Sequence, residues 1–208
     1  MEALKMMVQS TPNPNALKFV LNRPVKKEGK ATYKTAEECH ENPLARNLFT
    51  VAHVSEVYFY DNVITVTQDG SGDWDTIEGQ VKAKITESID THNPDFKAGS
   101  EHRTAKGPSS PEITKIDEIL NRTVRPYLQA DGGDLQVLAV EENIVTVHYQ
   151  GACGTCPSSI MGTLKAIEGI LRDEYRPDAE AHAVRIAHSD LLARLYSKVL
   201  HKDIPDFP

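Results

Sequence analysis

The chain has 208 residues, of which 39% are hydrophobic and 25% charged, an ordinary globular composition with room for two small domains. A net charge of −7 argues against a nucleic-acid-binding protein, because such proteins need a basic face for phosphates. Three cysteines are too few for a secreted disulfide framework, and no apolar run could span a bilayer, so no membrane partner is expected. The first residues also lack the pattern of a secretory or organelle-targeting peptide, which predicts a cytoplasmic protein.

The chain begins with two predicted strands, residues 4–9 and 16–22, around the turn Thr-Pro-Asn-Pro-Asn at 11–15. Proline fixes φ and asparagine tolerates unusual dihedrals, so this turn is rigid, and it is either purely structural or an exposed docking loop. The polar segment 26–34 is expected to be a loop. Asn42 before Pro43 predicts the start of a helix, with Asn42 as its cap.

The clearest local signal in the first half is a hairpin formed by residues 54–60 and 63–68, with Asp61-Asn62 as its turn. Asp73 is expected to cap a following helix with an apolar stripe at steps of three and four, made of Trp74, Ile77, Val81, Ile85 and Ile89. These elements predict an α+β domain. Cys39, the one thiol in this half, is expected to be a packed residue.

Residues 92–111 separate the second half of the chain from the first, and their Pro, Gly, Ser and charged residues predict a flexible linker. Beyond it we expect a helix capped by Ser110 and bent near Pro126, a turn at 131–134, strands at 135–140, 144–149 and 183–187, and helices at 158–171 and after Ser189. The predicted fold class is therefore two small α+β domains with helix-covered antiparallel or mixed sheets. The predicted boundaries are 1–91, 92–111 for the linker, 112–188, and 189–208 for a helical extension.

Two cysteines, Cys153 and Cys156, lie between a predicted strand and a predicted helix in the segment Gly-Ala-Cys-Gly-Thr-Cys-Pro, residues 151–157. Two thiols at this spacing can share a soft metal or form a disulfide with each other, so the motif alone leaves both open. The nearby helix N-terminus favours the metal-binding thiolate. The glycines Gly151 and Gly154 let backbone amides converge on an anion, or simply allow a tight turn.

The chain resembles the NifU-like (Nfu-type) iron–sulfur carriers in both halves. In the first half the resemblance is carried by Thr11-Pro12-Asn13-Pro14-Asn15-Ala16-Leu17-Lys18-Phe19, Asn42-Pro43-Leu44-Ala45-Arg46, Ile64-Thr65-Val66-Thr67 and Asp73-Trp74. In the second half it is carried by Val124-Arg125-Pro126-Tyr127-Leu128, Asp131-Gly132-Gly133-Asp134 and the cysteine segment 151–157, which are similar to the C-terminal domain of NifU.

The resemblance implies a non-enzymatic protein that binds a 4Fe–4S cluster between two subunits through Cys153 and Cys156. A 4Fe–4S cluster prefers one thiolate for each iron, and one chain has only these two in the motif, so a cluster-bridged homodimer is expected. An upstream scaffold would donate the cluster and apo iron–sulfur proteins would receive it. Two alternatives stay open: a thiol–disulfide oxidoreductase with Cys153 as nucleophile, and a zinc site with help from His148.

Overall fold

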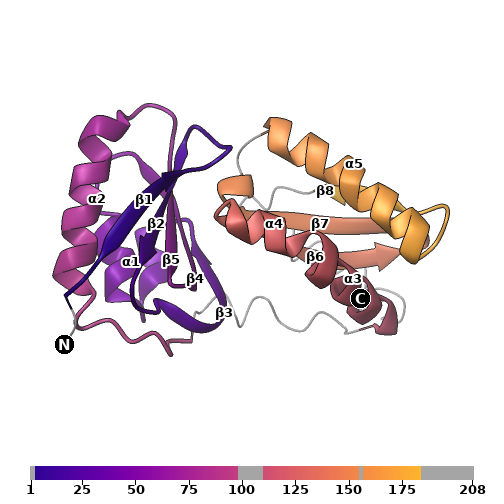
Figure 1. Ribbon diagram of the computed structural model, residues 1–208, viewed down its shortest axis with the longest axis horizontal. Helices are drawn as coiled ribbons and strands as arrows, with labels where there is room; N and C mark the ends of the chain where they lie inside the picture. The colour runs from indigo at the N-terminus through magenta and orange to yellow at the C-terminus, as the bar shows by residue number, and fades with distance from the viewer. Residues whose placement is uncertain (1–2, 98–109, 155–156, 184–208) are drawn as a thin grey trace, which may run out of the picture.

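The computed structural model of the protein describes residues 3–97, 110–154 and 157–183, which form two sheets, each with its own helices (Figure 1). This confirms the expected fold class of two α+β domains. The linker residues 98–109 and the tail 184–208, including the helix expected after Ser189, lie outside the described residues. The predicted domain boundaries therefore stay predictions. Among the described helices, none combines the length and apolar character that crossing a membrane requires.

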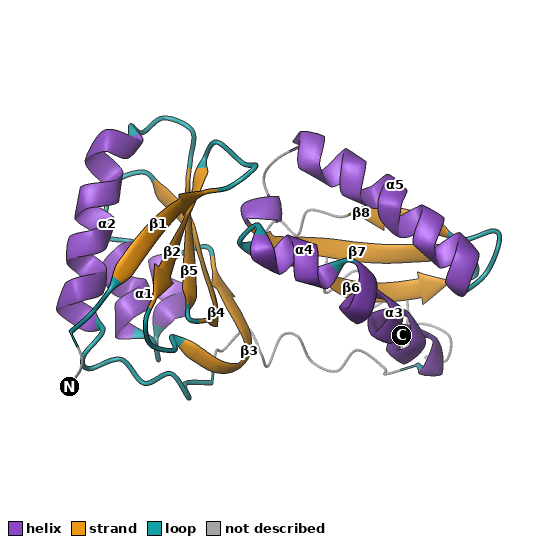
Figure 2. Ribbon diagram, in the orientation of Figure 1, coloured by secondary structure: helices purple, strands orange, loops and turns teal. Residues whose placement is uncertain are grey.

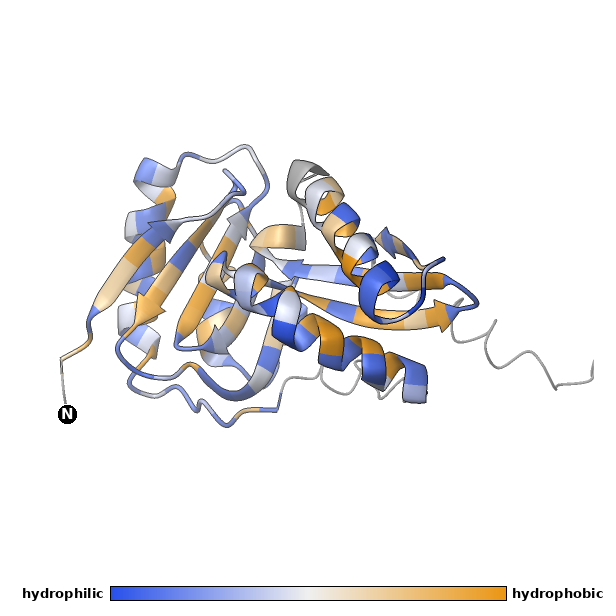
Figure 3. Ribbon diagram, turned by 45° about the vertical axis from the view of Figure 1, so that its right-hand side comes forward, coloured by the Kyte–Doolittle hydropathy of each residue, from blue (hydrophilic) through white to orange (hydrophobic). Residues whose placement is uncertain are grey.

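The first domain is an antiparallel sheet with helices over one face. The strand order is β1-β2-β5-β4-β3, formed by β1 (Met6–Ser10), β2 (Ala16–Leu21), β3 (Lys26–Tyr33), β4 (Val54–Asp61) and β5 (Val63–Gln68). The helices α1 (Pro43–Leu48) and α2 (Trp74–Ser88) and a 3-10 turn, η1 (Ala36–Cys39), complete the domain. Hydrophobic positions run through the strands, and the loops are mainly hydrophilic (Figure 3).

Local sequence signals explain most of this domain. The side chain of Asn42 accepts a hydrogen bond from the Ala45 amide at 3.1 Å and caps α1. Asp73 caps α2 in the same way, accepting from the Asp75 amide at 3.1 Å. The β4–β5 hairpin turns at Asp61, whose φ is +48°, as the predicted Asp-Asn turn requires.

The segment expected to be a loop at 26–34 is instead the edge strand β3, so that prediction was wrong. Only Ala31 and Tyr33 of this strand join the core of the first domain, and a bulge with Gly29 at φ +70° interrupts its alternation. Lysines and a bulge are typical of edge strands, because they hinder pairing with another chain. The hydrophobic pattern was therefore too short to reveal the strand.

The second domain is a mixed sheet with three helices over one face (Figure 2). In order β6-β7-β8, β6 (Gly133–Glu141) pairs antiparallel with β7 (Ile144–Gly151), which pairs parallel with β8 (Glu180–Ala183). The helices are α3 (Pro111–Thr123), α4 (Arg125–Ala130) and α5 (Pro157–Glu174). The helix predicted to loosen at Pro126 is broken at Val124 into α3 and α4. The third strand lies at 180–183, earlier than predicted, and residues 184–187 are not described.

Candidate functional site: the cysteine loop

The candidate site is the cysteine loop, residues 151–157, which joins β7 to α5 as the sequence predicted. A 3-10 turn, η2 (Ala152–Gly154), follows β7, and Thr155 and Cys156 lie outside the described residues. Gly151 has φ +62°, and a Cβ added there would lie 2.6 Å from the carbonyl oxygen of Gly132. Only glycine fits this position, because both the backbone conformation and the space exclude a side chain.

Cys153 is the described thiol of the loop, and it is buried with 6% of its surface exposed. Its sulfur lies directly over Gly133, where an added Cβ would be 2.6 Å from Sγ. The thiol belongs to the core of the second domain and borders a pocket of about 260 Å³, which Pro12 and Asn13 of the first domain also line. The structure therefore places one of the two predicted ligands on a covered strand-to-helix turn.

Cys39 lies in the core of the first domain, where it is 1% exposed. Its Sγ donates to the carbonyl oxygen of Thr35 at 3.4 Å, and burial raises the pKa of the thiol to about 12. A neutral, enclosed thiol of this kind is a poor metal ligand, since metals bind the thiolate.

Side chains of the first domain hydrogen-bond directly to the described part of the cysteine loop. The amide of Gly151 donates to Oε1 of Glu56 at 2.8 Å, although the two residues are 95 positions apart. The Asn13 Nδ2 donates to the carbonyl oxygen of Ala152 at 2.9 Å. Asn13 belongs to the rigid turn at 11–15, so this turn contacts the cysteine loop of its own chain.

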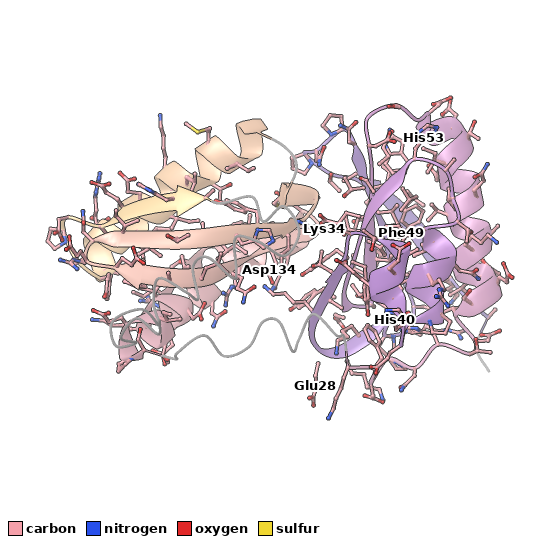
Figure 4. All side chains as sticks on the ribbon, turned by 180° about the vertical axis from the view of Figure 1, so that it is seen from behind. Glu28, Lys34, His40, Phe49, His53 and Asp134 are labelled. Carbon is pink, nitrogen blue, oxygen red and sulfur yellow. The ribbon has the colours of Figure 1, made fainter. Side chains whose placement is uncertain are left out.

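The turn before β6 is a second point of contact between the domains. Asp134 is 2% exposed, and its Oδ2 lies 2.9 Å from Nζ of Lys30, which also donates to the carbonyl oxygen of Leu135 at 2.9 Å. Arg125 lies on the other side of Asp134, with Nε at 3.5 Å from Oδ1. Asp134 is at the junction of the two domains (Figure 4). Burial lowers the pKa of Lys30, and the neighbouring Asp134 opposes this shift.

Burial shapes the electrostatics around the loop. Desolvation raises the pKa of Glu56 to about 7, with Glu38 adding to the rise, whereas Lys34 and the Gly151 amide oppose it. Burial and the nearby Cys153 raise the pKa of Tyr149, so this phenol stays neutral beside the thiol. The site thus combines a buried thiol with a carboxylate that takes up a proton near neutral pH.

The sequence predicted the position of the cysteine loop and offered the 11–15 turn as a possible docking loop, but it missed Glu56 and Lys30 and did not show that Asn13 of this turn contacts its own chain. Glu56 directly precedes the hydrophobic residues of β4. A charged residue beside this buried run was the one sequence signal that could have pointed to a role for Glu56. His148, the residue considered for zinc, lies buried on β7 opposite Gln136.

Comparison with known proteins places both domains in one family. Residues 6–92 match the family model described as the N-terminal domain of the scaffold protein Nfu/NifU, and residues 116–181 match the NifU-like domain. Over 183 residues the chain is 33% identical to the human "NFU1 iron-sulfur cluster scaffold homolog, mitochondrial", covering 84% of this chain and 69% of that protein. The chain belongs to the Nfu/NifU family. It carries an N-terminal Nfu domain followed by a C-terminal NifU domain, as the resemblance implied.

A plant relative agrees with this assignment. "NifU-like protein 4, mitochondrial" of Arabidopsis thaliana is 31% identical over 172 residues, covering 80% of this chain and 61% of that protein. This chain thus spans about 61–69% of the length of these two relatives. The solution structure of a NifU-like protein from Saccharomyces cerevisiae is 21% identical and covers 48% of this chain and 91% of that one, with a TM-score of 0.42.

The names of these relatives contradict the predicted cytoplasmic localisation, because the human and Arabidopsis proteins are both described as mitochondrial. That prediction rested on the missing pattern of a targeting peptide in the first residues. The chain matches only part of each relative's length, so its first residues were a poor basis for the inference.

Proposed function

We propose that this chain is an iron–sulfur cluster carrier that binds a 4Fe–4S cluster through Cys153 and Cys156, shares it with a second copy and delivers it to apo-proteins. The observation that carries the proposal is the position of Cys153 on the turn between β7 and α5. Cys156 directly precedes Pro157, the first residue of α5. Along the sequence, both thiols of the motif fall within four residues of Pro157.

The chemistry of this position suits a cluster as cargo. The unpaired amides and the dipole of a helix N-terminus favour the thiolate form of a nearby cysteine, which is the form that binds iron. A 4Fe–4S cluster is held by about four thiolates. Each chain supplies Cys153 and Cys156, so two copies complete the ligand set. A cluster held across two chains can be released by exchanging one chain for the thiols of a recipient.

The family supports the wider setting of this function. The human relative is named an iron–sulfur cluster scaffold and a mitochondrial protein, which favours a mitochondrial role for this chain as well. In that role an upstream scaffold donates the cluster, and apo iron–sulfur proteins receive it. The chain acts as a carrier and not as an enzyme.

Anaerobic reconstitution with iron and sulfide tests the proposal. We expect about four irons per dimer, a brown chromophore and a shift from monomer to dimer in size-exclusion chromatography. Cys153→Ala and Cys156→Ala should each abolish stable cluster binding, because each removes two ligands from the dimer. Cys39→Ala is the matched control and should retain the full iron content.

A colourless monomer that takes up no iron would refute the proposal. Reduction of insulin disulfides by the same sample would then favour a thiol–disulfide oxidoreductase. One zinc per chain without sulfide would instead favour a zinc module, the other alternative that the motif leaves open.

A further inference from the structure

The first sheet has a polar face that is nevertheless buried. Core residues such as Phe59, Ile64 and Val66 point towards α1 and α2, so their neighbours along each strand point the other way. On that second face Glu56 is 5%, Tyr58 1% and Thr65 0% exposed. An antiparallel sheet commonly leaves such a face to water. Here the second domain covers it (Figure 1).

The contacts on this face converge on the two segments that frame Cys153. A Cβ added to Gly151 would lie 3.1 Å from Cδ1 of Tyr58, and one added to Gly132 would lie 2.8 Å from Oγ1 of Thr65. These close approaches join the hydrogen bonds from Asn13 and Glu56 to the loop and the ion pair between Lys30 and Asp134. Lys18 adds a hydrogen bond to the carbonyl oxygen of Ala130.

We propose that the polar face of the first sheet is a docking surface for residues 151–153 of the cysteine loop, and that the docked arrangement is the cluster-free form of the protein. This inference rests on the proposed function. Docking and sharing of a cluster with a second copy are then alternatives, and the first domain must leave the loop before the cluster is bound. The first domain is thus a cover for the ligand-bearing turn.

The composition of the interface makes docking reversible. Among the described residues, the contacts include hydrogen bonds and an ion pair to polar side chains, which water can replace when the domains separate. Among the described residues, the hydroxyls of Tyr58, Thr65 and Thr67 are buried with no hydrogen-bond partner in the protein. Burial of such hydroxyls opposes docking, because they lose their hydration. An interface of this kind suits a cover that opens.

In the docked form, the first domain contacts two features that a bound cluster would use, the pocket beside Cys153 and the Gly151 amide. Asn13 and Pro12 line the pocket beside Cys153, so a second chain that brought its own thiols to this pocket would meet the first domain. The Gly151 amide already donates to the Glu56 carboxylate. Backbone amides at such turns otherwise stabilise anionic groups, and a thiolate-bound cluster is anionic. In the cluster-free form, the Glu56 carboxylate therefore accepts a hydrogen bond from a backbone amide that lies close to the proposed cysteine ligand Cys153.

Charge reversal at Lys30 tests the proposal in the full-length apo-protein. Lys30→Glu sets a carboxylate against buried Asp134 and should open the interface, since breaking a buried ion pair leaves a charge uncompensated. Lys27→Glu is the matched control. Lys27 lies on the same strand, and its partner is the exposed Asp95. Both variants change the net charge equally.

Two measurements report docking directly. Hydrogen exchange at the Gly151 amide should be at least about tenfold faster in Lys30→Glu than in the wild type or in Lys27→Glu. The radius of gyration from small-angle X-ray scattering should increase in Lys30→Glu alone. Cluster loading during anaerobic reconstitution should be faster in this variant, with the same final iron content.

The wild type, Lys30→Glu and Lys27→Glu should first be shown by circular dichroism to be folded. Equal exchange rates and equal radii of gyration for these three proteins would overturn the docking proposal, even if all of them bind a cluster. Faster exchange and a larger radius in Lys30→Glu, with no iron bound by any protein, would instead overturn the proposed function and leave docking supported. If Lys30→Glu does not fold, Lys30→Met decides. It keeps the aliphatic stem and removes the charge, and unchanged exchange at Gly151 would then refute docking.

Discussion

Gly133→Ala provides a sharp test of how the cysteine loop is packed. Gly133 is the first residue of β6 and pairs with Gly151 across the sheet. A Cβ at this position would lie 2.6 Å from Sγ of Cys153, 2.9 Å from its amide nitrogen and 2.9 Å from the carbonyl oxygen of Gln150. Relaxed contacts between such atoms are about 3.5–4.0 Å. The methyl group therefore needs a shift of roughly 1 Å in its neighbours.

Two of the three neighbours are backbone atoms, so a change of side-chain rotamer cannot relieve the clash. Overpacking of this kind costs about 1–3 kcal/mol of unfolding free energy. We expect the second domain to lose that amount, and the turn carrying Cys153 to move away from β6. Displacement of the thiol should also lower the iron content after reconstitution, because iron–sulfur bonds to the cluster form only when each ligand sulfur lies close to its required position.

Urea unfolding followed by two signals measures this effect. Trp74, the one tryptophan of the chain, lies in the first domain, so its fluorescence reports that domain, and circular dichroism reports both. The loss should therefore appear in circular dichroism and not in fluorescence. Gly169→Ala is the control: nothing lies within 4 Å of its added Cβ on α5, and it should stabilise the helix by about 0.5–1 kcal/mol. A Gly133→Ala protein with wild-type stability and wild-type iron content would refute this packing argument.

Two further predictions concern pH and the remaining cysteine. Burial raises the pKa of Glu56 from its ordinary value of 4.5 to about 7, so the docked form binds this proton more tightly than the form with separated domains. Docking should therefore weaken by up to roughly 3 kcal/mol as pH rises from 4.5 to 7. Hydrogen exchange at the Gly151 amide between pH 5 and 8, corrected for intrinsic rates, should show this loss, and the Glu56→Gln protein should not. If Glu56→Gln shows the same pH dependence, the effect belongs to other groups. Lys34 and Glu38 are the charges that face this carboxyl. Cys39→Ala should cost about 1 kcal/mol in the fluorescence-detected unfolding of the first domain, because it empties a small buried volume, and rapid alkylation of native Cys39 at pH 8 would contradict its raised pKa.

Elements governed by neighbouring residues were predictable from the sequence. Asn42 and Asp73 cap their helices through bonds to amides two or three positions away, and the β4–β5 hairpin depends on its own turn. The position of Cys153 between a strand and a helix follows from the same local chemistry. Family resemblance then carried the inference from two thiols to an iron–sulfur cluster.

Elements that depend on distant segments were not predictable in this way. β3 has too few core-facing residues to show a strand pattern, and it forms because β4 offers an edge for pairing. Glu56 and Lys30 acquire their roles only when the second domain lies on their sheet. Hydrogen bonds between residues 95 positions apart leave no periodic trace in a sequence. The sequence by itself thus determined where the two thiols of the motif lie along the chain, and the tertiary structure decided what covers Cys153, because burial and charge pairing arise only when separate segments pack together.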